Sequence, residues 1–392
     1  MSEPRSGATS GPLSTATSEP PSGAVVTDPA TVAPASPRPR GRRRLVVVAV
    51  LGAAAALAVP FVADAFWLQL ALFAMAAAVA ALGLTLLLGQ AGQLSLGHTF
   101  FLAIGAYGYT FLAAEDGPLG SGLGLPPALA AVLAVALAGL AGLLFSPIAG
   151  RLRGIYLGIA SLGLVFFGLH ILDNAPSLTG GDNGRSVPVF TLAGVRFAAD
   201  PDQPQYVANV LFGREQKLWY LFLIVTVVAY LYFRNLVRGR PGRALRAVRD
   251  RESMAEIIGV PVTRYKAYAF LISSMYAGVG GVLYALAFRR VVPEAFGVAL
   301  AVEYLAMVVI GGLGVAGGAV AGAAFVSWLP PVLERYSVHL PGLATEPGAA
   351  GINPSVAAKF IYGGAVIALL LFEPGGLAGV ARRLRRRTTA QQ

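Results

Sequence analysis

The chain has 392 residues, of which 56% are hydrophobic and 12% are charged, and its formal net charge is +11. Soluble domains carry about 25% charged residues, so this composition excludes an ordinary soluble protein and favours a chain embedded in lipid. Cysteine is absent, which excludes disulfides and cysteine-bound metals, and the three histidines, His98, His170 and His339, lie far apart in the sequence. We therefore expect neither a metal nor another cofactor.

The first 44 residues differ from the rest of the chain. Residues 1 to about 37 are rich in Ser, Thr, Pro, Ala and Gly without an apolar period, which predicts a disordered tail. A basic cluster then precedes the first apolar run, and it consists of Arg38, Arg40, Arg42, Arg43 and Arg44. We expect an uncleaved first helix whose N-terminus is held in the cytoplasm.

Ten apolar segments reach or approach the length of about 20 residues that a helix needs to cross a membrane. They span residues 45–66, 68–88, 95–114, 127–149, 154–172, 217–235, 267–288, 299–313, 316–333 and 358–373. Most are apolar on all faces, unlike the helices of a soluble protein. The expected fold is all-α, a polytopic membrane protein with about ten spanning helices, or eight if the glycine-rich segment 299–333 is a broken hairpin.

Basic residues test this topology. With both termini in the cytoplasm, 22 of the 30 Lys and Arg residues fall on the inner side, as the positive-inside rule requires. The main exceptions are Arg289 and Arg290. We expect a transmembrane domain over 45–381, an external loop at 174–216, an internal loop at 236–266 and a basic cytoplasmic tail at 382–392.

The stretch GQAGQLSLGHTFFLAIGAYGYT (89–110) is polar for a membrane helix. As a helix, it would place Gln90, Gln93 and Gly97 on one face and Ser95 and His98 on a neighbouring one. Such side chains must face the protein interior. Two interpretations remain open: they bond neighbouring helices together, or they line a translocation path beside a helix that breaks at Gly89 and Gly92.

A second glycine-rich segment is VVIGGLGVAGGAVAGAAF, where Gly314, Gly318 and Gly322 form a GxxxGxxxG row. This spacing favours close packing against another helix. The segments LTLLLGQAG and MVVIGGLG both end an apolar run in GxxG, which suggests an internal structural repeat.

The two long loops carry further candidates. The external sequence LTGGDNGRSVP includes Thr179, Gly180, Gly181 and Asn183, which is typical of tight turns, although its amides could also bind an anion or dock a partner. In the internal loop, residues 243–258 fit a basic amphipathic helix that Gly259 would end. Such a helix either lies on anionic lipid or enters a groove on another protein. The sequence lacks a GxxxxGK[ST] phosphate loop, so another chain must hydrolyse any ATP.

Six ordered blocks over about residues 70–380 resemble one known family. They are LLLGQAGQLSLGHTFFLAIGAY, RLRGIYLGIASLG, LTGGDNG, GRALRAVRDRESMAEIIGVPVTRYKAYAFLIS, VVIGGLGVAGGAVAGA and LLLFEPGGLAG. The family is that of permease subunits of ABC importers for branched-chain amino acids, specifically the longer, M-type permease of the pair.

The resemblance implies a non-catalytic subunit of a bacterial plasma-membrane importer for leucine, isoleucine or valine. Its implied partners are a second permease, two cytoplasmic ATPases and an external solute-binding protein. The implied ATPase-docking residues are Glu252, Met254, Ala255, Ile257 and Gly259. Ser253, Met254 and Ala255 depart from the EAA pattern of the wider superfamily.

Two other transport functions remain as alternatives. Related permeases for urea or short amides resemble the same blocks. An ATP-independent channel or secondary carrier would usually need an acidic residue within the membrane, for which Glu303 is the clearest candidate. An intramembrane enzyme is disfavoured because no nucleophile and base stand at a recognisable spacing.

Overall fold

The computed structural model describes residues 51–52, 54–116, 121–152, 154–192, 194–198, 206–207, 210–339, 351–373, 375–380 and 382–383. The expected N-terminal tail with its arginine cluster lies outside these residues, as does most of the basic C-terminal tail. Contacts divide the chain into Met1–Ala54 and Ala55–Gln392, and the second unit holds every element named below.

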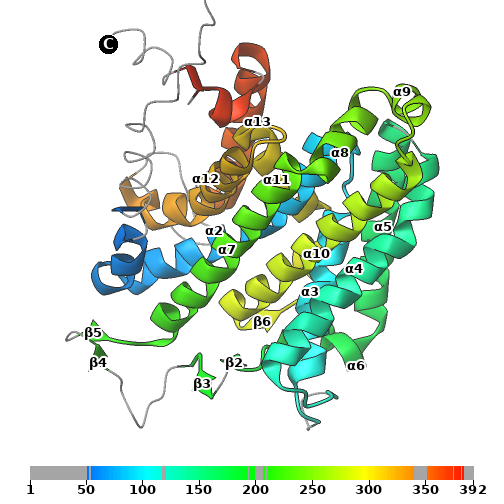
Figure 1. Cartoon of the computed structure of the whole chain (residues 1–392). Helices are drawn as coiled ribbons and strands as arrows, with labels where there is room; N and C mark the ends of the chain where they lie inside the picture. The colour runs from blue at the N-terminus through cyan, green and yellow to red at the C-terminus, as the bar shows by residue number, and fades with distance from the viewer. Residues whose placement is uncertain are drawn as a thin grey trace, which may run out of the picture. The chain divides into compact units, whose positions relative to one another are not determined.

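The described part of the chain is mainly helical (Figure 1). Residues 54–62 are helical. The long helices that follow are α2 (Ala65–Thr85), α3 (His98–Ala113), α4 (Pro127–Arg151), α5 (Ile155–Asn174), α7 (Arg214–Arg238), α10 (Val262–Phe288), α11 (Val298–Gly311), α12 (Ala316–Arg335) and α13 (Pro354–Phe372). Shorter helices are α6 (Pro176–Thr179), α8 (Arg240–Asp250) and α9 (Glu252–Ile257), together with the π turn η1 (Leu86–Gln90) and the 3₁₀ turns η2 (Gly181–Asn183), η3 (Pro293–Phe296) and η4 (Ser337–His339).

Six of these helices are long and apolar enough to cross a membrane: α2 with η1, α4, α5, α7, α10 and α12. The helices α11 and α13 are apolar but shorter. The expectation of a polytopic helical membrane protein is therefore confirmed, while ten crossings remain a prediction. Each of the ten expected segments overlaps a helix among the described residues, and the start of the first segment, at 45–50, lies outside them.

Among the residues that the structure describes, six short strands form three antiparallel pairs. They are β1 (Arg185–Ser186) with β6 (Arg290–Val291), β2 (Thr191–Leu192) with β3 (Val195–Arg196), and β4 (Tyr206–Val207) with β5 (Val210–Leu211). In the first pair Arg185 lies opposite Val291 and Ser186 opposite Arg290. This pair joins the loop after α5 to the end of α10.

The helices α2 and α10 form the buried centre, and α10 packs against α2, α3 and α4. Small residues allow this close approach: Gly105 of α3 faces the backbone of Gly278 in α10, with no room for a Cβ between them. The 27 residues of α10 span about 40 Å. Since α8 and α9 precede its first residue and β6 follows its last, these elements lie near opposite ends of α10.

Candidate functional site

The polar stretch after α2 is a break between two helices. The end of α2 widens into the π turn η1, and residues 91–97 are not helical before α3 begins at His98. Gly92 adopts φ +68°, a left-handed conformation that glycine reaches without strain. The expectation that Gln90, Gln93 and Gly97 share one helix face is therefore wrong, because the backbone turns between them.

Three of the four polar residues in this stretch are bonded to the surrounding chain, and His98 and Ser95 are two of them. His98 is buried and its Nε2–H donates to the carbonyl oxygen of Ala80 at 2.8 Å, since a carbonyl can only accept. The buried hydroxyl of Ser95 accepts from the backbone N–H of Gly97 at 3.3 Å. Both side chains thus stabilise the return of the chain into α3.

The two glutamines of the break differ from each other. Gln90 is buried, donates through Nε2 to the carbonyl oxygen of Gly314 at 2.9 Å, and accepts through Oε1 from Arg246 Nη1 at 3.2 Å. Gln93 is equally buried, but neither atom of its amide has a hydrogen-bond partner among the described residues. Of the four residues, Gln93 alone in this part of the structure has no hydrogen-bond partner for either atom of its amide, although buried polar groups are usually bonded.

A second break lies between α11 and α12 and contacts the first. It includes Gly312 and Gly314, both with positive φ, at +108° and +79°. A Cβ added to Gly89 would overlap the backbone nitrogen of Gly314 and lie 2.5 Å from its Cα, so the two backbones touch. The two segments that end in GxxG are therefore neighbours in space.

The glycine row in α12 packs against α11. A Cβ on Gly318 would overlap the carbonyl oxygen of Gly311, and one on Gly322 would overlap that of Met307. Gly314 lies in the break before α12 and not on this helix face, which corrects the expected continuous row. Gly97 is close to α5, where a Cβ would lie 2.9 Å from the carbonyl oxygen of Ser161.

The loop between α7 and α10 is a helical hairpin. The expected single helix over 243–258 is interrupted at Arg251, whose extended backbone (φ −156°, ψ 103°) separates α8 from α9. Gly259 follows α9 with φ +82°, and the bonds Val260 N–H to Ala255 O and Gly259 N–H to Glu256 O form a Schellman motif. The chain therefore turns sharply before α10.

The helix α9 is buried on one side only. Ala255 packs with Val248 of α8 and Val262 of α10, and all three are buried. On the opposite side Met254 is 54% exposed and Ile257 is 78% exposed. The adjoining Ile258 is also exposed. The hairpin thus carries an apolar patch, formed by Met254, Ile257 and Ile258, on a basic surface.

Glu252 and Lys266 fasten α9 to α10. Lys266 Nζ lies 2.6 Å from Glu252 Oε1, and the lysine side chain is 3% exposed. A buried ammonium needs such a partner, because desolvation without one is costly. Of the five residues expected to dock the ATPase, Glu252 and Ala255 therefore hold the hairpin together, Gly259 ends it, and Met254 and Ile257 are available to a partner.

Two arginines of α8 belong to the same site and were not among the expected residues. Arg249 Nη1 donates to the carbonyl oxygen of Gly89 at 2.7 Å, and its Cγ would lie 2.5 Å from a Cβ added to Gly92. Arg246 contacts Gln90 as described above. Their spacing of three residues, which places both on one face of a helix, is the signal in the sequence that points to them.

The four candidates of the loop expected to be external lie in the turn that follows α5. They are Thr179, Gly180, Gly181 and Asn183. Thr179 is buried, and its hydroxyl donates to Ala175 O at 3.0 Å and accepts from the N–H of Gly181. Gly180 ends α6 with φ +78°. Asn183 is exposed, and its carbonyl accepts from Arg290 Nη1 at 3.1 Å. These residues form a structured turn whose outer surface includes Asn183.

Arg185 anchors this turn. Its buried guanidinium donates to the carbonyl oxygens of Ser121 and Leu178 and lies 5.5 Å from the ring centre of Phe111. Burial lowers the pKa of Arg185, but a guanidinium stays protonated in proteins. Nearby Arg289 pairs with Glu215 at 3.0 Å, so both of these basic residues have partners of their own.

Glu303 lies in a groove between α11 and α13. The groove has a volume of about 550 Å³, is lined mainly by apolar side chains, and includes Lys359. A carboxylate beside a lysine is less suited to binding a coupling cation than an acidic site without one. The geometry therefore gives the carrier alternative little support.

Comparison with known proteins identifies the family. Residues 66–340 match the family model described as branched-chain amino acid transport system / permease component. The chain is 33% identical over 298 residues to the high-affinity branched-chain amino acid transport system permease protein LivM of Salmonella typhimurium and to LivM of Escherichia coli, covering 74% of this chain and 68% of each relative. It is 28% identical to the permease protein LivH of Escherichia coli, over 66% of this chain and 82% of that one. No solved structure matches. The chain therefore belongs to the family of permease components of branched-chain amino acid transport systems.

Proposed function

We propose that this permease imports leucine, isoleucine or valine, and that ATP hydrolysis on two partner ATPases drives the transport. The single observation that carries the ATPase assignment is the apolar patch on α9, where Met254, Ile257 and Ile258 are exposed. The hairpin residues Leu245, Val248 and Ala255, by contrast, are buried. Exposed apolar groups on an otherwise basic surface are typical of a protein contact.

The hairpin geometry favours a protein partner over the lipid surface. A helix that lies on a membrane needs a continuous apolar face free to enter the headgroup region. In α8 that face is occupied, because Leu245 is 3% exposed and Val248 is 1% exposed. Only the short α9 presents apolar side chains, and an area of this size suits a groove on a docking protein.

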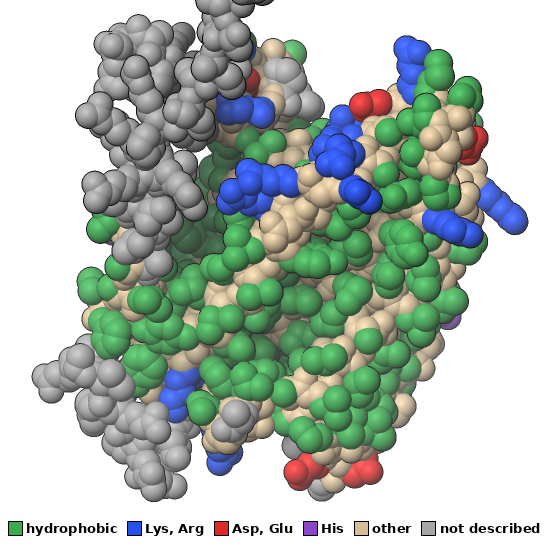
Figure 2. Space-filling view, viewed as in Figure 1, with side chains coloured by type: hydrophobic (Ala, Val, Ile, Leu, Met, Phe, Trp, Pro, Cys, Tyr) green, Lys and Arg blue, Asp and Glu red, His purple; other side chains and the backbone are tan. Residues whose placement is uncertain are grey.

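We place the hairpin in the cytoplasm. Figure 2 shows Lys and Arg side chains gathered at the end that carries α8 and α9, above a broad hydrophobic surface. The segment from Arg234 to Lys266 contains nine basic residues, as expected for an inner loop. The loop after α5 would then lie outside, where a solute-binding protein would dock, and both termini would lie on the cytoplasmic side of the bacterial plasma membrane.

The proposed cycle is alternating access with a second permease of the related type. Both LivM and LivH relatives match this chain, which supports a pair of homologous permeases. Closure of the ATPase pair would move the docked hairpins and open a path to the outside, where the binding protein releases its amino acid. Each state must bind the solute with a different affinity for the cycle to have a direction.

The test is uptake into proteoliposomes that contain both permeases and both ATPases. With the binding protein outside the vesicles and ATP inside, labelled leucine should accumulate. Excess valine should compete with leucine for uptake, whereas excess urea should not compete. Accumulation of urea but not leucine would reject the proposed substrate. Uptake that persists with an ATPase whose phosphate loop is inactivated would reject the ATP-driven mechanism.

The docking assignment has its own test. Met254→Asp should reduce co-purification of the ATPases about tenfold or more, since a charge in the buried centre of an interface costs over about 1.4 kcal/mol. The matched control is Val195→Asp, because Val195 is also 54% exposed but lies in β3 of the external loop. Equal capture of the ATPases by the two variants would refute docking on α9.

A further inference from the structure

The two helix breaks form one unit. Gly89 and Gly314 are in backbone contact, and no Cβ fits between them. Gln90 then bonds the carbonyl oxygen of Gly314 through Nε2 at 2.9 Å, a contact between residues 224 positions apart. A displacement of either break must therefore move the other.

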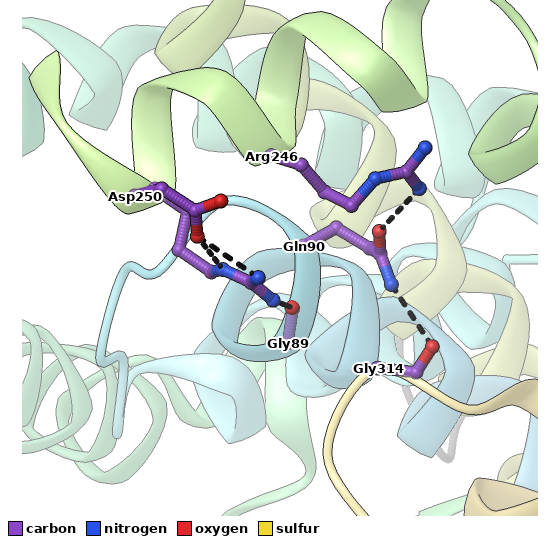
Figure 3. Close-up of polar contacts among 6 residues, drawn as sticks. Gly89, Gln90, Arg246, Asp250 and Gly314 are labelled. Atoms are coloured by element: carbon purple, nitrogen blue, oxygen red, sulfur yellow. Dashed lines mark hydrogen bonds and ion pairs between the residues drawn. The ribbon is translucent and has the colours of Figure 1, made fainter.

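The helix α8 contacts this unit through two cations. Arg249 donates to the carbonyl of Gly89 at 2.7 Å, and Arg246 donates to Gln90 Oε1 at 3.2 Å (Figure 3). The last carbonyls of a helix lack partners within it and carry partial negative charge. Arg249 meets this need at Gly89, where η1 continues α2, and bonds from a charged donor are about twice as strong as neutral ones.

Arg246 also reaches the end of α7. Its Nη1 donates to the carbonyl oxygen of Val237 at 3.0 Å. One guanidinium group therefore joins the last turn of α7 to Gln90, and through Gln90 to Gly314. Removal of this side chain would leave the buried Oε1 of Gln90 without the donor that it has in the structure.

The hairpin is able to carry a displacement from α9 to these arginines. Val248 lies in α8 between Arg246 and Arg249, and it packs against Ala255 of α9 in a small buried cluster. Lys266 holds the start of α9 through Glu252. The apolar patch on α9 is thus connected by packed side chains to the face of α8 that contacts the breaks.

We propose that Arg246 and Arg249 are positioning residues that couple the hairpin to both helix breaks, so that movement of α9 changes the geometry of residues 89–92 and 312–315 together. This inference rests on the proposed function, because α9 is where the ATPase would act. It assigns no solute contact to the arginines. Their role is to make the breaks follow the hairpin.

The experiment measures leucine transported per ATP hydrolysed in the reconstituted complex. The double variant Arg246→Ala/Arg249→Ala should still capture the ATPases and hydrolyse ATP, but the transported leucine per ATP should fall about fivefold or more. The control is Arg243→Ala, which removes one positive charge from the same helix. Arg243 is exposed and bonds only the carbonyl of Arg238, at 3.5 Å, among the described residues.

Conservative variants separate positioning from general stability. Arg249→Lys can still donate to the single carbonyl of Gly89, and it should retain most of the coupling ratio. If the double variant transports as much leucine per ATP hydrolysed as Arg243→Ala, the proposal is overturned. It is also overturned if the double variant loses ATPase capture as strongly as Met254→Asp, because the arginines would then be docking residues.

A second measurement keeps the inference distinguishable from the proposed function. If the unaltered complex fails to take up leucine, the proposed substrate is rejected. The contact between Arg246 and Gln90 is then tested by a double-mutant cycle on thermal unfolding of the purified permease. Gln90→Ala and Arg246→Ala should be non-additive, while Gln90→Ala and Arg243→Ala should add. Additivity in both cycles would overturn the coupling contact, whatever the solute.

Discussion

Gly89→Ala tests whether the two helix breaks are in contact. The added Cβ would overlap the backbone nitrogen of Gly314 and lie 2.5 Å from its Cα, whereas real Cβ contacts are essentially never shorter than 3.0 Å. The obstacle is backbone and not the end of a flexible side chain, so the breaks must separate by at least about 0.5 Å. The Gln90 to Gly314 bond, at 2.9 Å, spans the same contact.

The expected cost follows from this overlap. Forcing one extra carbon into a packed interior costs about 1–3 kcal/mol, and a weakened hydrogen bond adds up to about 1 kcal/mol. The control is Gly163→Ala in α5, where nothing lies within 4 Å of an added Cβ. That change should be neutral or stabilising, because alanine favours a helix by about 1 kcal/mol over glycine.

The assay is thermal unfolding of the detergent-purified permease, followed by tryptophan fluorescence and by recovery of monodisperse protein on size exclusion. The midpoint of Gly89→Ala should fall below that of the unaltered protein, and the midpoint of Gly163→Ala should not. If both variants unfold at the same temperature as the unaltered permease, residues 89 and 314 are not in contact and the interpretation of the breaks as one unit is wrong.

Two further substitutions test the roles of Lys266 in the hairpin and of the Gln93 amide. Lys266→Met should destabilise the hairpin by about 1.5 kcal/mol and reduce ATPase capture, since it removes the charged hydrogen bond between Lys266 and Glu252, whose side chain is 23% exposed. Arg383→Met, which breaks a pair whose arginine is 70% exposed, should have no such effect on capture. Gln93→Leu should preserve or raise the unfolding midpoint, because it removes a buried amide that has no partner among the described residues, yet lower leucine uptake about fivefold. Loss of the assembled complex in Gln93→Leu would instead assign that side chain to packing.

The helices could be predicted from the sequence because each is a long apolar run, and this signal is local. The break at residues 91–97 could not be predicted as firmly. Gln90, Gln93 and Gly97 have helical spacing, but the backbone between residues 91 and 97 is not helical and turns at Gly92. The interruption at Arg251 has still less signal, since neither glycine nor proline occurs there.

The contacts of the site depend on distant pairs. Gln90 meets Arg246 from 156 positions away and Gly314 from 224 positions away, and a single sequence contains no record of such pairings. The sequence does show the residue types that take part. A glutamine and glycines end one apolar run, a similar GxxG ends another, and two arginines three residues apart lie between these runs.

A force applied to α9 has two routes into the membrane domain. One passes through Lys266 into α10, and the other through Arg246 and Arg249 into the breaks. The first route ends in a helix that packs against α2, α3 and α4, and a closely packed interior resists deformation. The second ends in non-helical backbone, where glycines with positive φ allow dihedral change without a clash of side chains. Displacement should therefore concentrate at the breaks, and the first of them includes Gln93, whose buried amide has no hydrogen-bond partner among the described residues.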